Sequence, residues 1–275
     1  MAHDVKANAL QRLRGLCVSC TALVLLASPA FAGGQNQTAN ASAQTSTASS
    51  PPDFLLGRPR VMVGVRGSFF KASAGSDIYD FVTDQFTIDK SDFNTGSFTA
   101  ELGVSVTPRF DITASMDLNG LSRPSEDRDE EEQLPNGSRI PIQQVTELEQ
   151  MNFVASAKFL LLPRGRSVSR LAWIPNTFVP YVGAGGGYGK YTFRQNGDFV
   201  DFVDHHIFTD TFRSEGWTPI FHVLGGTDIQ VMRRLVLSFE GRYSWQHSDL
   251  GSDFIDFAPI DLGGFRFGAG VHFAF

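Results

Sequence analysis

Charged residues recur on one face of several segments in which polar and apolar residues alternate. Glu240 and Arg242 lie two residues apart, so in an extended strand they share a face, and pairing with opposite charges is the chemistry that suits them. Charges withdrawn from bulk water must be paired, and acids and bases occur here in similar numbers. We therefore predict an interior network of ion pairs. Its candidate members are Arg66, Glu101, Lys158, Asp228, Glu240, Arg242 and Arg266.

Residue types that suit catalysis occur, but not at the spacing that catalysis needs. His247 and Ser248 are adjacent, so in a strand they point to opposite faces, which disfavours a lipid-modifying esterase as the alternative function. The segment 183–191 is similar to a phosphate-binding loop, but Ala184 replaces the first glycine and Tyr191 replaces the hydroxyl that would hold magnesium. We expect no enzyme activity, no catalytic residue and no cofactor.

An acidic and aromatic repeat occurs in the segments 77–82, 198–204 and 253–257. Acids recur every three residues with aromatic residues between them, which favours a helical turn with one apolar side. One interpretation is a rigid cap in which the Phe residues pack together. The other is a docking surface or a divalent-cation site, because hard cations prefer carboxylate oxygens. The candidate ligands are Asp198, Asp201, Asp253 and Asp256.

Strands are the elements that must position these residues. From Phe265 to Phe275 one parity is apolar and aromatic and the other is small or charged, as in a strand with two unlike faces. Seven further segments share this alternation, the last three less cleanly: 98–106, 112–118, 151–159, 235–245, 61–70, 179–193 and 220–231. This predicts eight strands of about ten residues, a length that crosses a bilayer at a tilt.

The connections between these segments alternate in length and in charge. Those at 107–109, 161–177 and 232–234 are short or turn-rich and carry Arg without acids, whereas those at 72–95, 120–146, 195–217 and 246–262 are long and acidic. Short periplasmic turns and long extracellular loops are typical of outer-membrane barrels, and a soluble sandwich gives no reason for them. We predict an eight-stranded antiparallel up-and-down transmembrane β-barrel. The net charge of −6 and the lack of a basic stripe disfavour nucleic-acid binding.

The N-terminus resembles an export signal. Basic residues, a short apolar run and the small-x-small sequence ending at Ala32 predict a signal peptide over 1–32. Both cysteines, Cys17 and Cys20, lie within it. The polar segment 33–57 predicts a disordered periplasmic lead-in, and 58–275 predicts one barrel domain.

The C-terminus ends on an aromatic residue that follows alternating apolar positions, Val271, Phe273 and Phe275. This resembles the signal that the barrel assembly machinery recognises. Together with the glycine-rich segment 180–188, it makes residues 58–275 similar to the OmpA/OmpX-type outer-membrane β-barrel (porin family) proteins. The resemblance implies the bacterial outer membrane as location, with its lipid and lipopolysaccharide as neighbours, and it does not specify a function.

The interior of an eight-stranded barrel is only wide enough for its own side chains. We therefore expect a charge-paired, largely plugged lumen, with acidic and aromatic external loops that serve a structural or interaction protein. The alternative is a narrow channel for small solutes or ions, in which the charges act as a gate.

Overall fold

The computed structural model describes residues 55–133, 137–169, 172–201 and 206–275. The predicted signal peptide and residues 33–54 of the predicted lead-in lie outside them. Among the described residues, no helix is long and apolar enough to cross a membrane.

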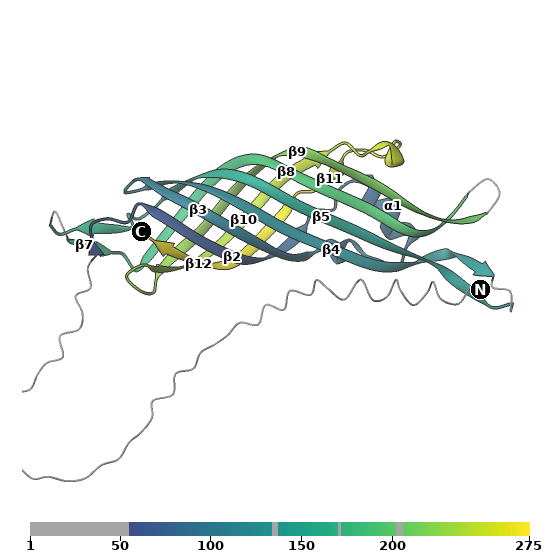
Figure 1. The fold of residues 1–275 in the computed structure, drawn as a ribbon, viewed down its shortest axis with the longest axis horizontal. Helices are drawn as coiled ribbons and strands as arrows, with labels where there is room; N and C mark the ends of the chain where they lie inside the picture. Colours follow the sequence, from purple (N-terminus) through teal and green to yellow (C-terminus); the bar gives the residue numbers. More distant parts are fainter. Residues whose placement is uncertain (1–54, 134–136, 170–171, 202–205) are drawn as a thin grey trace, which may run out of the picture. The chain divides into compact units, whose positions relative to one another are not determined.

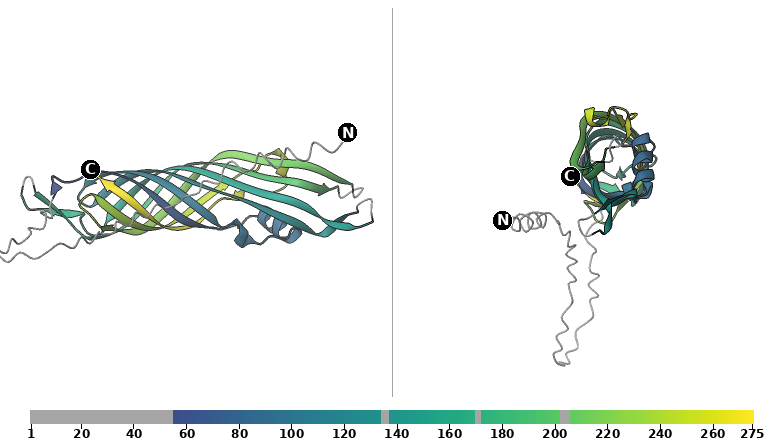
Figure 2. Two further views of the ribbon diagram at one scale, coloured as in Figure 1. Left: turned by 60° about the horizontal axis from the view of Figure 1, so that its bottom comes forward. Right: turned by 90° about the vertical axis from the view of Figure 1, so that its right-hand side faces the viewer.

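Antiparallel strands form a sheet that closes into a ring, seen from one end in Figure 2. Around the ring the strands are β2 (Val61–Ala72), β3 (Thr95–Thr107), β4 (Phe110–Gln133), β5 (Arg139–Leu160), β8 (Phe178–Val200), β9 (Ile207–Gln230), β10 (Leu235–Ser248) and β12 (Gly264–Ala274). β12 pairs with β2 and β10 pairs with β9, which closes the circle. The prediction of an all-β fold with antiparallel strands in a closed ring is confirmed.

Alternation along each strand separates an outer from an inner face. On β12 the burial alternates without exception, so that Phe265, Phe267, Val271 and Phe273 point outward while Arg266 and His272 point inward. Large apolar side chains cover the outside of every ring strand, including Val65, Leu102, Ile112, Phe153, Val182, Phe221 and Tyr243. A water-soluble protein rarely exposes an apolar surface of this extent, whereas a bilayer requires it.

Aromatic side chains gather towards the two ends of this outer belt. Near one end Phe153 stacks on Trp217 with ring centroids 6.3 Å apart, and Tyr243 meets Trp245 edge-on at 4.8 Å. Near the other end Phe273 lies 6.0 Å from Phe275. Girdles of aromatic residues at both interfaces are typical of membrane barrels.

Four strands are much longer than the ten residues expected. β4, β5, β8 and β9 contain 24, 22, 23 and 24 residues, and much of the expected loops 120–146 and 195–217 forms the far ends of two long hairpins (Figure 1). The prediction of loops there was wrong because it relied on apolar alternation. Beyond the apolar belt a hairpin is held by backbone pairing, as from Gly120↔Glu149 to Glu126↔Gln143, so its side chains can be polar on both faces.

The other two long connections contain short helices. α1 (Asp77–Gln85) and the 3₁₀ turn η1 (Lys90–Phe93) lie between β2 and β3, and η2 (Ser252–Phe254) lies between β10 and the short strand β11 (Ile260–Asp261). The acidic repeat therefore forms a helix at 77–82 and a helical turn at 252–254. At 198–200 the prediction of a helical turn was wrong, because these residues continue β8 and pair with 207–209.

The end of the barrel opposite α1 carries a small second sheet. β1 (Leu55–Leu56), β7 (Ala172–Pro175) and β6 (Gly165–Ser167) pair in that order across the connection between β5 and β8. Its residues include a buried Trp173, 6% exposed. Leu55 and Leu56, expected in a disordered segment, are thus strand residues.

Candidate functional site

Two buried glutamates occupy the middle of the barrel interior and come from different strands. Glu101 on β3 and Glu240 on β10 each face inward, with side chains 3% and 1% exposed. Their neighbours across each strand pair are small: Gly64 lies opposite Glu101, and Gly226 and Gly268 lie opposite Glu240. These glycines leave room for the long charged side chains that meet in the centre.

Two cations bridge the two glutamates, and a third binds one of them. Arg66 on β2 donates from Nη1 to Glu240 at 2.8 Å and from Nη2 to Glu101 at 3.3 Å. Lys158 on β5 lies 2.7 Å from Glu101 and 3.1 Å from Glu240. Arg242 donates to Glu240 at 3.0 Å. These charge-assisted hydrogen bonds link β2, β3, β5 and β10 across the lumen.

Sequence reasoning missed several members of this cluster, Asp117 and Tyr181 among them. Asp117 on β4 accepts from Nη1 of Arg242 at 2.9 Å and from Thr99 at 2.6 Å, and the Tyr181 hydroxyl on β8 donates to Glu240 at 3.0 Å. The alternation of the segment 112–118 already places Asp117 on the polar, inner face, so Asp117 could have been included in the predicted network. Tyr181 was hidden because it precedes a glycine run that obscures the alternation of β8.

The glycine run on β8 brings that strand against β5. A Cβ atom added at Gly187 or Gly183 would collide with the backbone carbonyl of Phe153 or Ala157 on β5. Gly185 and Gly189 face inward, where a Cβ would meet His222 and Asn152. The run therefore has a packing role, which agrees with the rejection of a phosphate-binding loop.

Asp228 and Arg266 belong to the predicted network, but the structure places them at its two ends. Asp228 lies 2.7 Å from Arg164, which also lies 2.6 Å from Asp111. Arg266 makes no ion pair within the part of the chain that is described, and instead donates to Ser244 and Asn119, both at 3.2 Å, while stacking on Phe70 at 4.2 Å. The seven predicted residues thus share the inner face without forming one continuous ion-pair network.

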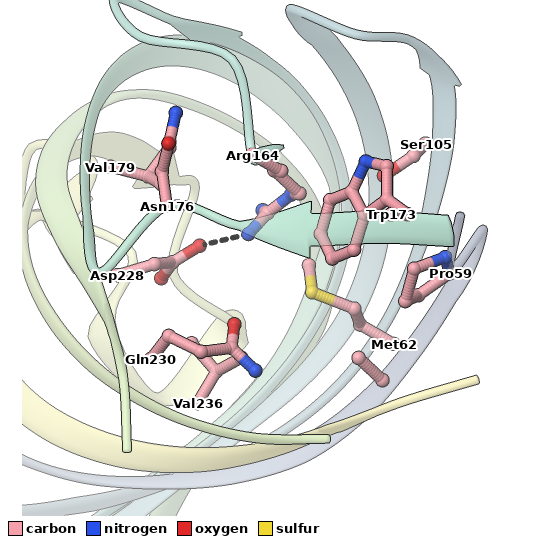
Figure 3. A pocket seen from close by; sticks show the side chains of 11 residues that line it. Pro59, Met62, Ser105, Arg164, Trp173, Asn176, Val179, Asp228, Gln230 and Val236 are labelled. Atoms are coloured by element: carbon pink, nitrogen blue, oxygen red, sulfur yellow. Dashed lines mark hydrogen bonds and ion pairs between the residues drawn. The ribbon is translucent and has the colours of Figure 1, made fainter. Parts of the chain in front are cut away.

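Arg164 marks the end of the lumen next to the small sheet. Figure 3 shows its guanidinium pointing at Asp228, with Trp173 of β7 lying across the opening beside Met62. Burial by itself would lower the pKa of Arg164, but Asp228 and Asp111 raise it above the usual value. The cavity that remains at this mouth has a volume of only ≈ 20 Å³, which is room for about one water molecule.

A buried apolar cluster lies towards the opposite end. Ile78, Tyr79 and Val82 of α1 are at most 1% exposed and pack with inward residues of β5 and β8, Leu148 and Phe193 among them. Phe254 of η2 meets Phe193 with ring centroids 5.4 Å apart. The Tyr79 hydroxyl donates to the carbonyl of Asp261 at 2.9 Å, and burial raises the pKa of this phenol above its usual value. α1 and η2 thus pack inside the wall formed by the long hairpins.

The candidate cation ligands are not brought together. Asp198 accepts from Thr209 at 2.6 Å, and Asp253 accepts from the backbone of Arg213 at 3.0 Å. Within the described ranges, no three His, Cys, Asp or Glu residues are arranged to hold a metal ion. A divalent-cation site at these loops, with Asp201 and Asp256 among its ligands, stays a prediction.

A buried serine–histidine pair does exist, at positions that the sequence did not suggest. Ser156 Oγ lies 2.8 Å from His222 Nε2 inside the barrel. The other ring nitrogen, Nδ1, has no hydrogen-bond partner in the described part of the chain, so no carboxylate orients the imidazole as a hydrolase would require. His247 and Ser248 are not paired with each other; His247 lies 3.8 Å from Asp261 instead.

The chain was compared with known proteins. No protein-family model and no curated protein matches it. Among solved structures it is similar to Neisserial surface protein A, with 13% identity, coverage of 78% of this chain and 97% of the other, and a TM-score of 0.42. It is also similar to the outer membrane protein OprG from Pseudomonas aeruginosa, with 8% identity, coverage of 80% and 99%, and a TM-score of 0.42. A third is the Escherichia coli outer membrane protein W, with 13% identity, coverage of 79% and 98%, and a TM-score of 0.36.

Proposed function

We propose that this outer-membrane β-barrel is a structural or interaction protein in which eight strands surround a closed lumen. Closed antiparallel sheets with an outer apolar belt and aromatic girdles are typical of outer-membrane barrels. The observation that carries the proposal is the central cluster, in which Arg66 and Lys158 each contact both Glu101 and Glu240. A side chain that must break two ion pairs to move is a poor gate, because each exposed charge would need a new partner.

The two ends of the lumen support the same proposal. Arg164 and Trp173 narrow one mouth, and the cluster around Tyr79 and Phe254 fills the other. A solute would have to displace three independent barriers of different chemistry. In this account Arg66, Glu101, Lys158, Asp228, Glu240, Arg242 and Arg266 stabilise the barrel by filling it.

The external hairpins and loops are the surface that we propose for interaction. The far end of β4 presents exposed acids, including Asp129 and Glu131, with Glu131 only weakly paired to Arg139 at 3.9 Å. These acids repel anionic lipopolysaccharide unless divalent cations bridge the two. A basic partner, or lipopolysaccharide in the presence of calcium or magnesium, fits this surface.

The C-terminal strand carries the proposed assembly signal. Val271, Phe273 and Phe275 are 44%, 49% and 59% exposed on the outer face, where an assembly factor can contact them. Deleting Phe275 is expected to reduce the amount of heat-modifiable protein in the outer membrane, because Phe275 also bonds to β2 through its backbone. Wild-type amounts after the deletion would contradict this role.

Liposome swelling tests the proposed function. Proteoliposomes containing the folded protein should swell in a small sugar no faster than empty liposomes, whereas a porin in matched liposomes should swell readily. Swelling that scales with the amount of this protein would favour the narrow channel instead.

A further inference from the structure

A small cavity lies inside the barrel beside the central cluster, on the side towards α1. It is lined by Arg66, Ser68, Thr99, Asp117, Glu240, Arg242 and Arg266. Its volume is ≈ 10 Å³, which is about the space that one water molecule or one small ion needs. Three of its seven lining side chains are arginines, and Arg66 and Arg266 are each only 4% exposed.

The two carboxylates in this lining are already neutralised. Asp117 accepts from Arg242 at 2.9 Å and from Thr99 at 2.6 Å. Glu240 accepts from Arg66 at 2.8 Å and from Arg242 at 3.0 Å, and Lys158 lies 3.1 Å from its other oxygen. Neither acid therefore presents an uncompensated negative charge to the cavity.

The cations are less completely satisfied. The cluster around the cavity contains four cations and three anions. The cations are Arg66, Lys158, Arg242 and Arg266, and the anions are Glu101, Asp117 and Glu240. Asp111 and Asp228 are not counted here, because they bind Arg164 at the far mouth. Arg266 is the excess charge, because within the described residues it bonds only to neutral groups. The Nε–H groups of Arg66 and Arg266 have no hydrogen-bond partner among the described residues.

An unpaired buried guanidinium and two buried N–H groups without acceptors are both costly in a low-dielectric interior. One small anion would compensate the charge and accept both hydrogen bonds, whereas a water molecule would supply only the acceptor. We propose that the cavity between Arg66, Arg242 and Arg266 is a binding site for a single small monovalent anion of the size of chloride, taken up when the barrel folds.

Crystallography on the wild-type protein tests this directly. Protein refolded and crystallised in sodium bromide should give an anomalous difference peak within hydrogen-bond distance of Arg66 and Arg266. Two results would overturn the proposal. One is the absence of such a peak, and the other is density at this place in bromide-free crystals that a water molecule explains equally well.

Thermal unfolding gives a second readout and has a matched control. At constant ionic strength, replacing gluconate by chloride should raise the Tm by roughly 3–6 °C for each tenfold increase in chloride above the Kd. Arg266→Met removes the excess charge and should abolish this dependence, while Arg213→Met, at an exposed position, should keep it. A wild-type Tm that is independent of chloride would contradict the site, whether or not Arg266→Met folds.

Discussion

At the scale of single residues, charged side chains from different strands bind one another across the lumen. Glu240 is the most connected, with Arg66, Lys158, Arg242 and Tyr181 all within hydrogen-bond distance of its two oxygens. A buried ion pair gives little net stability compared with a well-packed apolar core, but removal of one partner leaves the others uncompensated. We therefore expect the cluster to favour a single arrangement of the side chains over any partly open one.

Replacement of Glu240 tests this role. Glu240→Ala should destabilise the barrel by about 3–5 kcal/mol, because three cations lose a buried partner, and water that enters the lumen would reduce the loss. A melting curve measures it, with Glu215→Ala as control, since Glu215 is an exposed carboxylate that also contacts two cations. Unchanged stability in Glu240→Ala, together with new channel openings, would favour a gate.

At the scale of elements, α1 is one of the two helical segments that pack inside the wall formed by the long hairpins. Its residues Ile78, Tyr79 and Val82 face the long hairpins, whereas Phe81 is 40% exposed and lies against Phe257. The hairpins β4–β5 and β8–β9 extend beyond the neighbouring strands of the ring, so the far part of β4 has a free edge. The connection between β2 and β3 pairs with this edge, where the backbone N–H of Thr87 donates to the carbonyl of Glu126 at 2.9 Å. Covering such edges limits unwanted strand pairing.

An acid introduced into the apolar cluster tests whether α1 is fixed there. Val82→Asp should release α1, because an unpaired carboxylate cannot remain in a fully buried apolar position, and limited proteolysis should then cut between β2 and β3. Phe81→Asp adds the same charge at an exposed position of the same helix and should remain far more resistant. Equal resistance of the two variants would show that α1 does not depend on this packing.

The sequence predicted those elements that are governed by apolar alternation and failed where other forces dominate. The membrane-facing strands and the inward position of Glu101 and Arg266 followed from parity alone. The far ends of β4 and β8 could not be recognised, because backbone pairing holds them without an apolar face. The partners of each charge also could not be assigned, since they depend on strand register: Arg164, from a connection predicted to be a periplasmic turn, binds Asp111 and Asp228.

At the scale of the whole molecule, orientation follows from the unequal ends. The turn between β9 and β10 contains exposed Arg233 and Arg234, while the far hairpins are acidic. Short turns face the periplasm in membrane barrels. On intact cells a membrane-impermeant maleimide should therefore label Glu131→Cys and leave Arg233→Cys unlabelled. Both variants should be labelled after lysis, and labelling of Arg233→Cys alone on intact cells would show that the topology is inverted.

With this interior, the folded barrel is expected not to conduct. Single-channel recording in planar bilayers tests it most directly, with protein whose folding has been verified by heat modifiability in the same preparation. The current is expected to stay at background over the full range of applied voltage, because we propose that the central ion pairs and the groups at both ends block the lumen together. Sustained, reproducible openings of the unmutated protein would contradict it.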